Sequence, residues 1–280
     1  MDVPTESPNC PLCSANEPQS TGFVREPFRV VRCGGCRLWY LSPRLTADAT
    51  DRLYRSNDYF TGCDAGYADY SSQERSLRTT FRRLLHTMQQ SGMTGGRLLE
   101  VGAGLGYFLD EARGFFSSRT GVEMSSRAAA IAAEQSEATV LPGLEALDSE
   151  DLFDSIVALH VVEHVPDPVV WVRSLAQHLA PGGTVVLATP DMGSFWRLAM
   201  QSRWPSFKYP EHVAFYDRAT LPRLLAAAGL QRPARLRYLN SYPLSEVLAK
   251  LEIAAPEISR RVHVPLPATT ICYAAVRAGS

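Results

Sequence analysis

Short apolar runs alternate with amphipathic stretches from Gly96 to the end of the chain. The runs predict β-strands, and the stretches between them predict helices that begin behind turn residues. The expected strands cover 97–102, 119–123, 138–141, 153–160, 183–190, 231–240 and 269–278. The expected helices cover 106–116, 125–135, 167–180, 219–229 and 244–255. This order is typical of an α/β protein with helices on both faces of one sheet.

The alternation predicts a Rossmann-like, doubly wound fold with a mostly parallel seven-stranded sheet, which we assign to residues 94–280. Two helices are expected ahead of it, in a cap or linker over 46–93, the first behind Thr46 and the second over 71–90. Tyrosines between these helices are expected either to cover an active site or to pack in the interior; they are Tyr54, Tyr59, Tyr67 and Tyr70.

Residues 1–45 have little helical periodicity and are rich in Pro, Gly and Cys. Two CxxC pairs, Cys10 with Cys13 and Cys33 with Cys36, stand 19 residues apart, which matches a zinc ribbon. Four thiolates would close a tetrahedral structural Zn²⁺ site, so we expect zinc to organise a small zinc-ribbon-like module and to perform no chemistry. Three roles for the module stay open: substrate binding, a cap over the active site, or support of a homodimer.

Composition and charge narrow the classes of function. The 280 residues are 45% hydrophobic, enough for a sizeable core, and the net charge of -1 gives no overall attraction to nucleic acid. Arginines in the module are too few and scattered to make nucleic acid an expected partner: Arg25, Arg29, Arg32 and Arg37. No apolar run reaches the roughly 20 residues that span a bilayer, and the N-terminus lacks signal-peptide features. We expect a cytoplasmic protein without membrane insertion, in which Cys63 and Cys272 are ordinary thiols.

The most informative segment is LLEVGAGLGYFLD, where a predicted strand runs into Gly102, Gly104 and Gly106 and a helix follows at once. In a doubly wound sheet this turn faces the ligand crevice, and glycines let the backbone approach the ligand. Glu123 ends the next strand, 21 residues after Gly102, where a carboxylate can bind both ribose hydroxyls. Because Tyr107 replaces the third glycine of the dinucleotide fingerprint, S-adenosylmethionine, which has no phosphate, is favoured over NAD.

These segments resemble the class I S-adenosylmethionine-dependent methyltransferases, in particular a bacterial group with an N-terminal CxxC...CxxC module. The resemblance covers essentially the whole chain and rests on EVGAGLG, Glu123, FDSIVALHVVEHVPDP, LAPGGTVVLATP and the late EHVAFY. It implies that the cofactor is held by Glu100, Gly102, Gly104, Gly106 and Glu123. The family's adenine contacts come from the loop after the third strand, which here offers Leu144 and Glu145 but not the usual aspartate.

His160, Glu163 and His164 end the fourth predicted strand, where a helical turn would place all three on one face. Their spacing also matches the HxxEH motif of one class of zinc protease. That motif belongs inside a long helix, whereas Pro166 and Pro168 follow here and a strand precedes it. We therefore expect the cluster at the substrate crevice of the sheet.

A hydroxyl nucleophile must lose its proton during methyl transfer, and a histidine with an ordinary pKa of about 6.5 is a suitable general base. We expect His164 in this role, with His160 as second choice. Similar ubiquinone-pathway and small-RNA O-methyltransferases imply an alternative, in which His160, Glu163, His164 and His212 hold a divalent metal. His160 replaces a carboxylate of those relatives, which makes Mg²⁺ less natural. In a third interpretation, His164 and His212 only hydrogen-bond neighbouring loops.

We expect methyl transfer from S-adenosylmethionine to a small molecule, at a hydroxyl of a sugar, glycolipid or secondary metabolite. An insert over 191–216 is expected either to roof the substrate pocket or to pack in the interior; its aromatic residues are Trp196, Trp204, Phe207, Tyr209 and Phe215. Alternatives are RNA methylation or another N- or C-methylation, with a basic face expected for RNA. A non-catalytic, cofactor-binding scaffold is a further alternative, against which the intact glycine turn and Glu123 argue.

Overall fold

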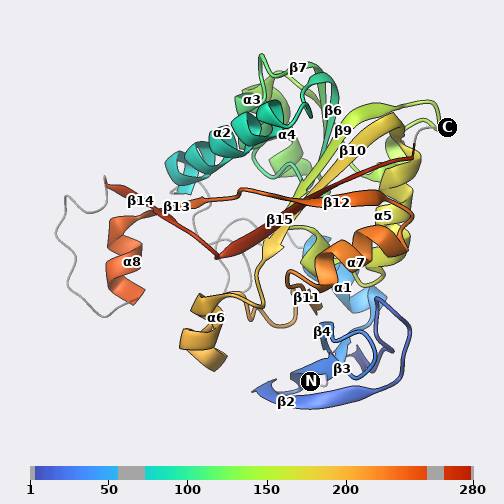
Figure 1. Ribbon diagram of the computed structural model, residues 1–280, viewed down its shortest axis with the longest axis vertical. Coiled ribbons are helices and arrows are strands. Elements are labelled where there is room, and N and C mark those ends of the chain that lie inside the picture. Colours follow the sequence, from blue (N-terminus) through green and yellow to red (C-terminus); the bar gives the residue numbers. More distant parts are fainter. Residues whose placement is uncertain (1–3, 56–72, 251–261, 279–280) are drawn as a thin grey trace.

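The computed structural model describes residues 4–55, 73–250 and 262–278 (Figure 1). Tyr59, Tyr67 and Tyr70, three of the tyrosines discussed above, lie outside these ranges, as does Cys63. The side chain of Tyr54 is not described either.

A seven-stranded sheet in the order β12-β15-β10-β9-β6-β7-β8 forms the centre of the molecule. Its strands are β6 (Gly95–Val101), β7 (Phe116–Val122), β8 (Thr139–Leu141), β9 (Phe153–Leu159), β10 (Leu179–Pro190), β12 (Gln231–Leu236) and β15 (Thr270–Val276). Strands β8, β7, β6, β9 and β10 pair in parallel, and β15 runs antiparallel between β10 and β12. The predicted Rossmann-like, mostly parallel sheet is therefore confirmed.

Helices cover both faces of this sheet (Figure 1). One apolar cluster joins α2 (Glu74–Gln90) and α3 (Tyr107–Glu111) to one face. A second joins α5 (Pro168–Gln177) and α7 (Thr220–Ala227) to the other, and α4 (Ser126–Ser136) connects β7 to β8. Among the described residues, no helix has the length and apolar character needed to cross a membrane.

Two elements differ most from the sequence prediction. The helix predicted over 106–116 ends at Glu111, because Gly114 adopts a left-handed φ of 82° and turns the chain into β7. The strand predicted over 231–240 divides into β12 and a separate β13 (Asn240–Pro243), which pairs with β14 (His263–Leu266) outside the main sheet. The last helix is α8 (Leu244–Lys250), and the rest of its predicted range lies outside the described residues.

The N-terminal region folds into short strands at the lower end of the molecule (Figure 1). Strands β2 (Pro18–Arg25), β3 (Phe28–Cys33) and β4 (Trp39–Leu41) form an antiparallel sheet, and β1 (Thr5–Glu6) pairs with β5 (Arg44–Leu45). Helix α1 (Ala47–Arg55) follows Thr46 as predicted. The fourth strand of the antiparallel sheet is β11 (Ala214–Phe215), which comes from the distant insert and pairs with β4.

The packing of α3 on α4 yields a stability prediction at Gly106, which has a φ of 82°. A Cβ there would lie 2.7 Å from the Cα of Ala132 in α4. We expect Gly106→Ala to lower the free energy of unfolding by about 3 kcal/mol, through left-handed strain and overpacking. Gly229 has a φ of 90° but open space around it. We therefore expect Gly229→Ala to lower the free energy of unfolding by only about 1–2 kcal/mol. Urea unfolding measures both, and equal losses would contradict the packing argument.

Candidate active site

The glycine turn lies between the ends of two strands. Gly102 has a φ of 79°, and its amide donates to the Val122 carbonyl at the end of β7 at 2.8 Å. A Cβ on Gly102 would lie 2.5 Å from Cγ2 of Val161, which follows β9. The turn is therefore packed directly against the segment that leaves β9, and only glycine fits at that point.

Glu123 fastens the end of β7 to the glycine turn. Its Oε2 accepts a hydrogen bond from the Gly104 amide at 2.8 Å, and its Oε1 accepts one from the Ser125 amide at 2.9 Å. Burial raises the pKa of Glu123, and the backbone donors oppose this rise. Because each carboxylate oxygen can accept a second hydrogen bond, the side chain fits the ribose role predicted for it.

Glu100 lies one strand away and is 3% exposed, with no hydrogen-bond partner for its Oε2. Burial and, secondly, the negative charge of Glu123 raise the pKa of the Glu100 carboxyl well above the ordinary value. Glu145 is exposed and Leu144 partly buried in a 3-10 turn after β8. The structure thus gathers Glu100, the three glycines and Glu123 at one edge, with Leu144 and Glu145 beyond β8.

A cavity of about 750 Å³ begins at the end of β9, where Leu159 and His160 line it. Its walls come from α2, from the 191–216 insert, and from β13 and β14. Val101 and Ala158 are register partners in β6 and β9, so the glycine turn and the cavity start from adjacent strand ends. Among the described residues, the turn itself contributes none of the lining.

The aromatic residues of the insert divide between cavity and core. Trp196 and Trp204 line the cavity, and Nε1 of Trp196 donates to the Pro267 carbonyl at 2.9 Å. Phe207 and Phe215 pack with Trp204 in an apolar cluster that includes N-terminal residues such as Phe28. The segment therefore contributes side chains both to the cavity wall and to the core, and Trp204 belongs to both.

The histidine cluster takes a different shape from the predicted helical face. His160 has a left-handed φ of 58°, and only Val162–His164 form a single 3-10 turn. His160, Glu163 and His212 line the cavity, whereas His164 is not part of the lining. The His164 and His212 rings meet edge to face with centroids 4.6 Å apart. Because the HxxEH residues do not share a helix, the zinc-protease arrangement is excluded.

Glu163 is a buried carboxylate among imidazoles. It is 1% exposed, its Oε1 lies 3.3 Å from Nδ1 of His160, and neither carboxylate oxygen makes a well-directed hydrogen bond. Burial raises its pKa, but the contact with His160 and the nearby His164 and His212 outweigh this and lower the pKa to about 2. The side chain is therefore ionised at neutral pH.

The imidazoles of His164 and His212 lie near the Glu163 carboxylate and are neutral. Burial lowers the pKa of both imidazoles, and that of His212 falls well below the ordinary value. Nδ1 of His212 lies 2.8 Å from the Ser206 carbonyl, to which it donates, leaving Nε2 with a lone pair. Ligand atoms of Glu163, His164 and His212 lie within 4.8 Å of one another. An ionised, buried carboxylate without a well-directed hydrogen bond, beside two neutral imidazoles, fits a divalent metal ion.

The four predicted cysteine ligands also converge, with ligand atoms within 4.8 Å of one another. Sγ of Cys10 lies 3.4 Å from Sγ of Cys36, and Sγ of Cys13 lies 3.6 Å from Sγ of Cys33. The Cys36 amide donates to Sγ of Cys33 at 3.4 Å, as a knuckle requires. This arrangement fits a four-coordinate metal ion.

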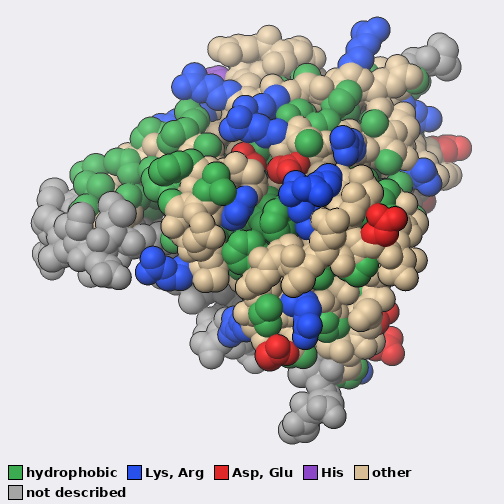
Figure 2. Space-filling model, turned by 60° about the horizontal axis from the view of Figure 1, so that its bottom comes forward, with side chains coloured by type: hydrophobic (Ala, Val, Ile, Leu, Met, Phe, Trp, Pro, Cys, Tyr) green, Lys and Arg blue, Asp and Glu red, His purple; other side chains and the backbone are tan. Residues whose placement is uncertain are grey.

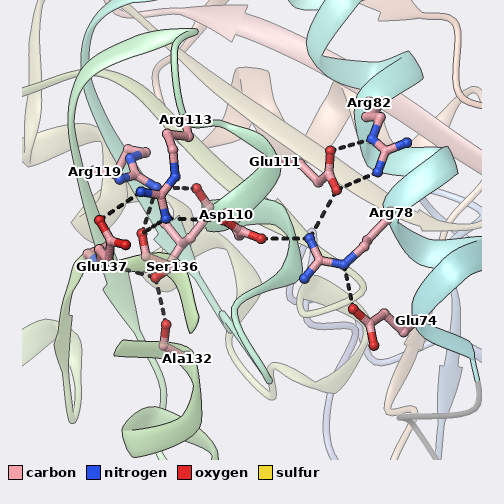
Figure 3. A network of polar contacts seen from close by, with 12 residues as sticks. Glu74, Arg78, Arg82, Asp110, Glu111, Arg113, Arg119, Ala132, Ser136 and Glu137 are labelled. Atoms are coloured by element: carbon pink, nitrogen blue, oxygen red, sulfur yellow. Dashed lines mark hydrogen bonds and ion pairs between the residues drawn. The ribbon is translucent and has the colours of Figure 1, made fainter. Parts of the chain in front are cut away.

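A network of ion pairs connects the cavity wall to the helix behind the glycine turn (Figure 3). Arg78 of α2 contacts Asp110 and Glu111 of α3 at 2.7 and 3.0 Å. Glu74 and Arg82 extend the network along α2. The helix that lines the cavity is thereby tied to the helix that follows the cofactor turn.

The polar lining of the cavity was not among the features predicted from the sequence. Ser76 and Thr80 line it from α2, and Thr80 Oγ1 accepts a hydrogen bond from the Ser241 amide of β13 at 2.9 Å. Two hydroxyls spaced i, i+4 on the apolar face of a predicted helix were the available signal. Asn240 and Tyr242 also line the cavity, but their short strand carries no such pattern.

Comparison with known proteins agrees with this geometry. A family model described as a methyltransferase domain matches residues 73–232. The chain belongs to this family and is an S-adenosylmethionine-dependent methyltransferase.

Two curated relatives carry the name ubiquinone biosynthesis O-methyltransferase. The protein from Bordetella bronchiseptica is 26% identical over 203 residues, which cover 67% of this chain and 84% of the relative. The protein from Xanthomonas campestris is 30% identical over 115 residues, covering 38% of this chain and 48% of the relative, about half its length.

Solved structures share the fold at low sequence identity. A methyltransferase from Thermotoga maritima has a TM-score of 0.54 and 20% identity, covering 75% of this chain and 94% of its own. A Bacillus subtilis protein has a TM-score of 0.51 and 15% identity, and the match covers 70% of this chain and 98% of the Bacillus chain.

The depressed pKa of His212 predicts how stability depends on pH. Below about pH 6.5 the unfolded chain protonates this histidine while the folded chain keeps it neutral, so stability is lost as the pH falls. The loss approaches about 1.4 kcal/mol per pH unit for one such group. Glu163 contributes only below about pH 4.3, outside this window.

We expect His212→Gln to reduce the slope of unfolding free energy between pH 6.5 and 5.5, measured by urea unfolding without added divalent ions. The exposed His86→Gln on α2 is the control and should keep the wild-type slope. Identical slopes in all three proteins would contradict the buried, neutral state of His212.

Proposed function

We propose that the enzyme transfers the methyl group to a hydroxyl of a small molecule bound in the 750 Å³ cavity. The observation that carries this proposal is the Glu163, His164 and His212 group, which opens on the cavity next to the end of β9. A hydroxyl needs activation that a thiol does not, and this group can supply it. The names of the curated relatives support an oxygen acceptor.

We assign cofactor binding to the glycine turn and the two carboxyls beside it. S-adenosylmethionine, when bound, supplies an electrophilic methyl group on a sulfonium. Glu123 would accept hydrogen bonds from the ribose hydroxyls, and the buried Glu100 would contribute the second carboxyl of the site. Leu144 and Glu145 stand at the place proposed for adenine contacts. The chain's main contribution is to hold both reactants at adjacent strand ends for in-line transfer.

We assign hydroxyl activation to a divalent ion held by Glu163, His164 and His212. Two imidazoles and one carboxylate favour a transition ion such as Mn²⁺ or Fe²⁺ over Mg²⁺. Such an ion lowers the pKa of a bound hydroxyl. His160 lines the cavity beside Glu163, so we assign it the proton that leaves the acceptor, in preference to His164, which is not part of the lining.

The cavity lining supports a ring-bearing acceptor. Trp196, Trp204 and Tyr238 offer aromatic surface, and Arg203 and Lys208 add positive charge. A cavity of this size with aromatic walls suits a secondary metabolite or sugar conjugate better than an RNA strand. On the face shown in Figure 2, Lys and Arg side chains stand in separate groups between apolar and polar surface, which also favours a small molecule. Labelled S-adenosylmethionine incubated with fractionated cell extract would identify the acceptor; labelling confined to RNA would contradict the proposal.

Structural zinc is the third part of the proposal. We assign it to Cys10, Cys13, Cys33 and Cys36, whose four thiolates leave no open coordination position for chemistry.

Removing the carboxylate at position 123 should impair cofactor binding. We expect Glu123→Ala to weaken S-adenosylmethionine affinity at least about tenfold, because a buried charged acceptor is lost and the Gly104 amide loses its partner. Calorimetry measures the affinity, with Glu134→Ala on exposed α4 surface as control. Unchanged affinity in Glu123→Ala would refute the cofactor assignment.

Neutralising Glu163 should remove metal binding at the cluster. We expect Glu163→Gln to weaken Mn²⁺ affinity at least about tenfold, measured by electron paramagnetic resonance, and to leave S-adenosylmethionine affinity intact. Glu211→Gln is the matched control, because Glu211 is also a buried carboxylate of this region but lies outside the ligand group. If Glu163→Gln transferred the methyl group at the wild-type rate, neither the divalent ion nor the negative charge of Glu163 would be needed for catalysis.

A further inference from the structure

One strand connects the four-cysteine module (residues 1–45) to the Glu163 cluster, which consists of Glu163, His164 and His212. Strand β11 (Ala214–Phe215) completes the module's sheet and begins two residues after His212. The Leu41 amide, in β4, donates to the Val213 carbonyl at 2.9 Å, and the Val213 amide donates to the Glu163 carbonyl at 2.8 Å. Two consecutive hydrogen bonds therefore lead from the module to the turn that carries Glu163.

A side chain of the module holds the other end of the same turn. Arg44 of β5 donates from Nη1 to the Pro166 carbonyl at 2.8 Å, two residues beyond His164. Its Nε donates to Glu6 at 2.8 Å, which orients the guanidinium. The turn is thus held by the N-terminal region at both Glu163 and Pro166.

The two clusters also share an apolar core. Cys10 and Cys33 are buried in the same cluster as Val162, which precedes Glu163, and Tyr216, which follows β11. Tyr216 is completely buried. Because packed interiors have little free volume, movement of the cysteines would displace these neighbours.

We propose that the four-cysteine module is a positioning element of the acceptor site, and that a metal ion held by the cysteines fixes β4 and, through it, His212 and Glu163. The inference rests on the function proposed for the Glu163 cluster. The backbone amides bound by Glu123, those of Gly104 and Ser125, belong to the main domain, so cofactor affinity should not depend on the module.

Removing one cysteine ligand tests the first half of this path. Cys13 is exposed, so Cys13→Ser should lower bound zinc below one ion per chain with little steric disturbance. We expect the Leu41 and Val213 amides to exchange with solvent at least tenfold faster, and Mn²⁺ affinity at the Glu163 cluster to fall at least tenfold. Amides of the β6–β7 ladder and S-adenosylmethionine affinity should stay within twofold of wild type.

A pair of arginine variants tests the second half without touching the cysteines. Arg44→Met removes the bond to Pro166, and we expect it to lower Mn²⁺ affinity about fivefold at full zinc content and wild-type cofactor affinity. Arg223→Met is the matched control: Nη1 of Arg223 donates to the Cys36 carbonyl at 3.0 Å but does not reach the Glu163 turn. This variant should bind Mn²⁺ within twofold of wild type.

The proposal would be overturned if the Val213 amide exchanged at the wild-type rate in Cys13→Ser. It would also be overturned if the two arginine variants changed Mn²⁺ affinity equally. If Cys13→Ser fails to fold, the difference in Mn²⁺ affinity between Arg44→Met and Arg223→Met tests the proposal instead. Failure of the proposed function gives a different result: wild-type protein would bind no Mn²⁺ at the cluster, while Val213 exchange in Cys13→Ser and Arg44→Met would still report whether the module holds the turn.

Discussion

The parallel pairing of β6 with β9 determines where the whole site lies. Val101 and Ala158 are in register, so both strands end at the same edge of the sheet. The glycine turn after β6 packs against Val161 so closely that a Cβ at Gly102 would overlap it. The cofactor and acceptor sites that we propose at these two strand ends are thereby neighbours. This preorganisation is what a one-step group transfer needs.

Three buried carboxyls near this edge behave differently because their surroundings differ. Glu100 is buried with no donor for one oxygen and lies near the charge of Glu123, so its pKa is raised well above the ordinary value. Glu123 has backbone donors on both oxygens that oppose the effect of burial. Glu163 has imidazoles around it, which keep it ionised despite equally deep burial. Burial alone would have raised the pKa of all three, so the neighbouring groups decide which of them carries charge.

The sequence contains most of the fold because its signals are local. Strand ends, glycines and Glu123 lie within short segments whose periodicity and spacing specify the first two strands and the turn between them. The pairing of β4 with β11 could not be predicted in this way, since it joins residues 39–40 to residues 214–215 and a two-residue strand has no periodicity. The placement of His160 relative to His164 could not be predicted for a related reason: it depends on a left-handed residue at 160, whereas the spacing alone suggested a continuous helical turn.

A small N-terminal unit gains from being built into the larger domain. Its strands are short, and its buried residues Cys10, Leu38 and Tyr40 belong to the same apolar cluster as Val185 of the central sheet. So few residues cannot bury enough apolar surface to fold independently, which is why such units depend on a metal ion, a partner surface or both. Here the partner surface includes the segment next to His212. The hydrogen bonds and packing that hold the unit on the larger domain therefore include contacts to the segment next to His212 and to the turn that carries Glu163.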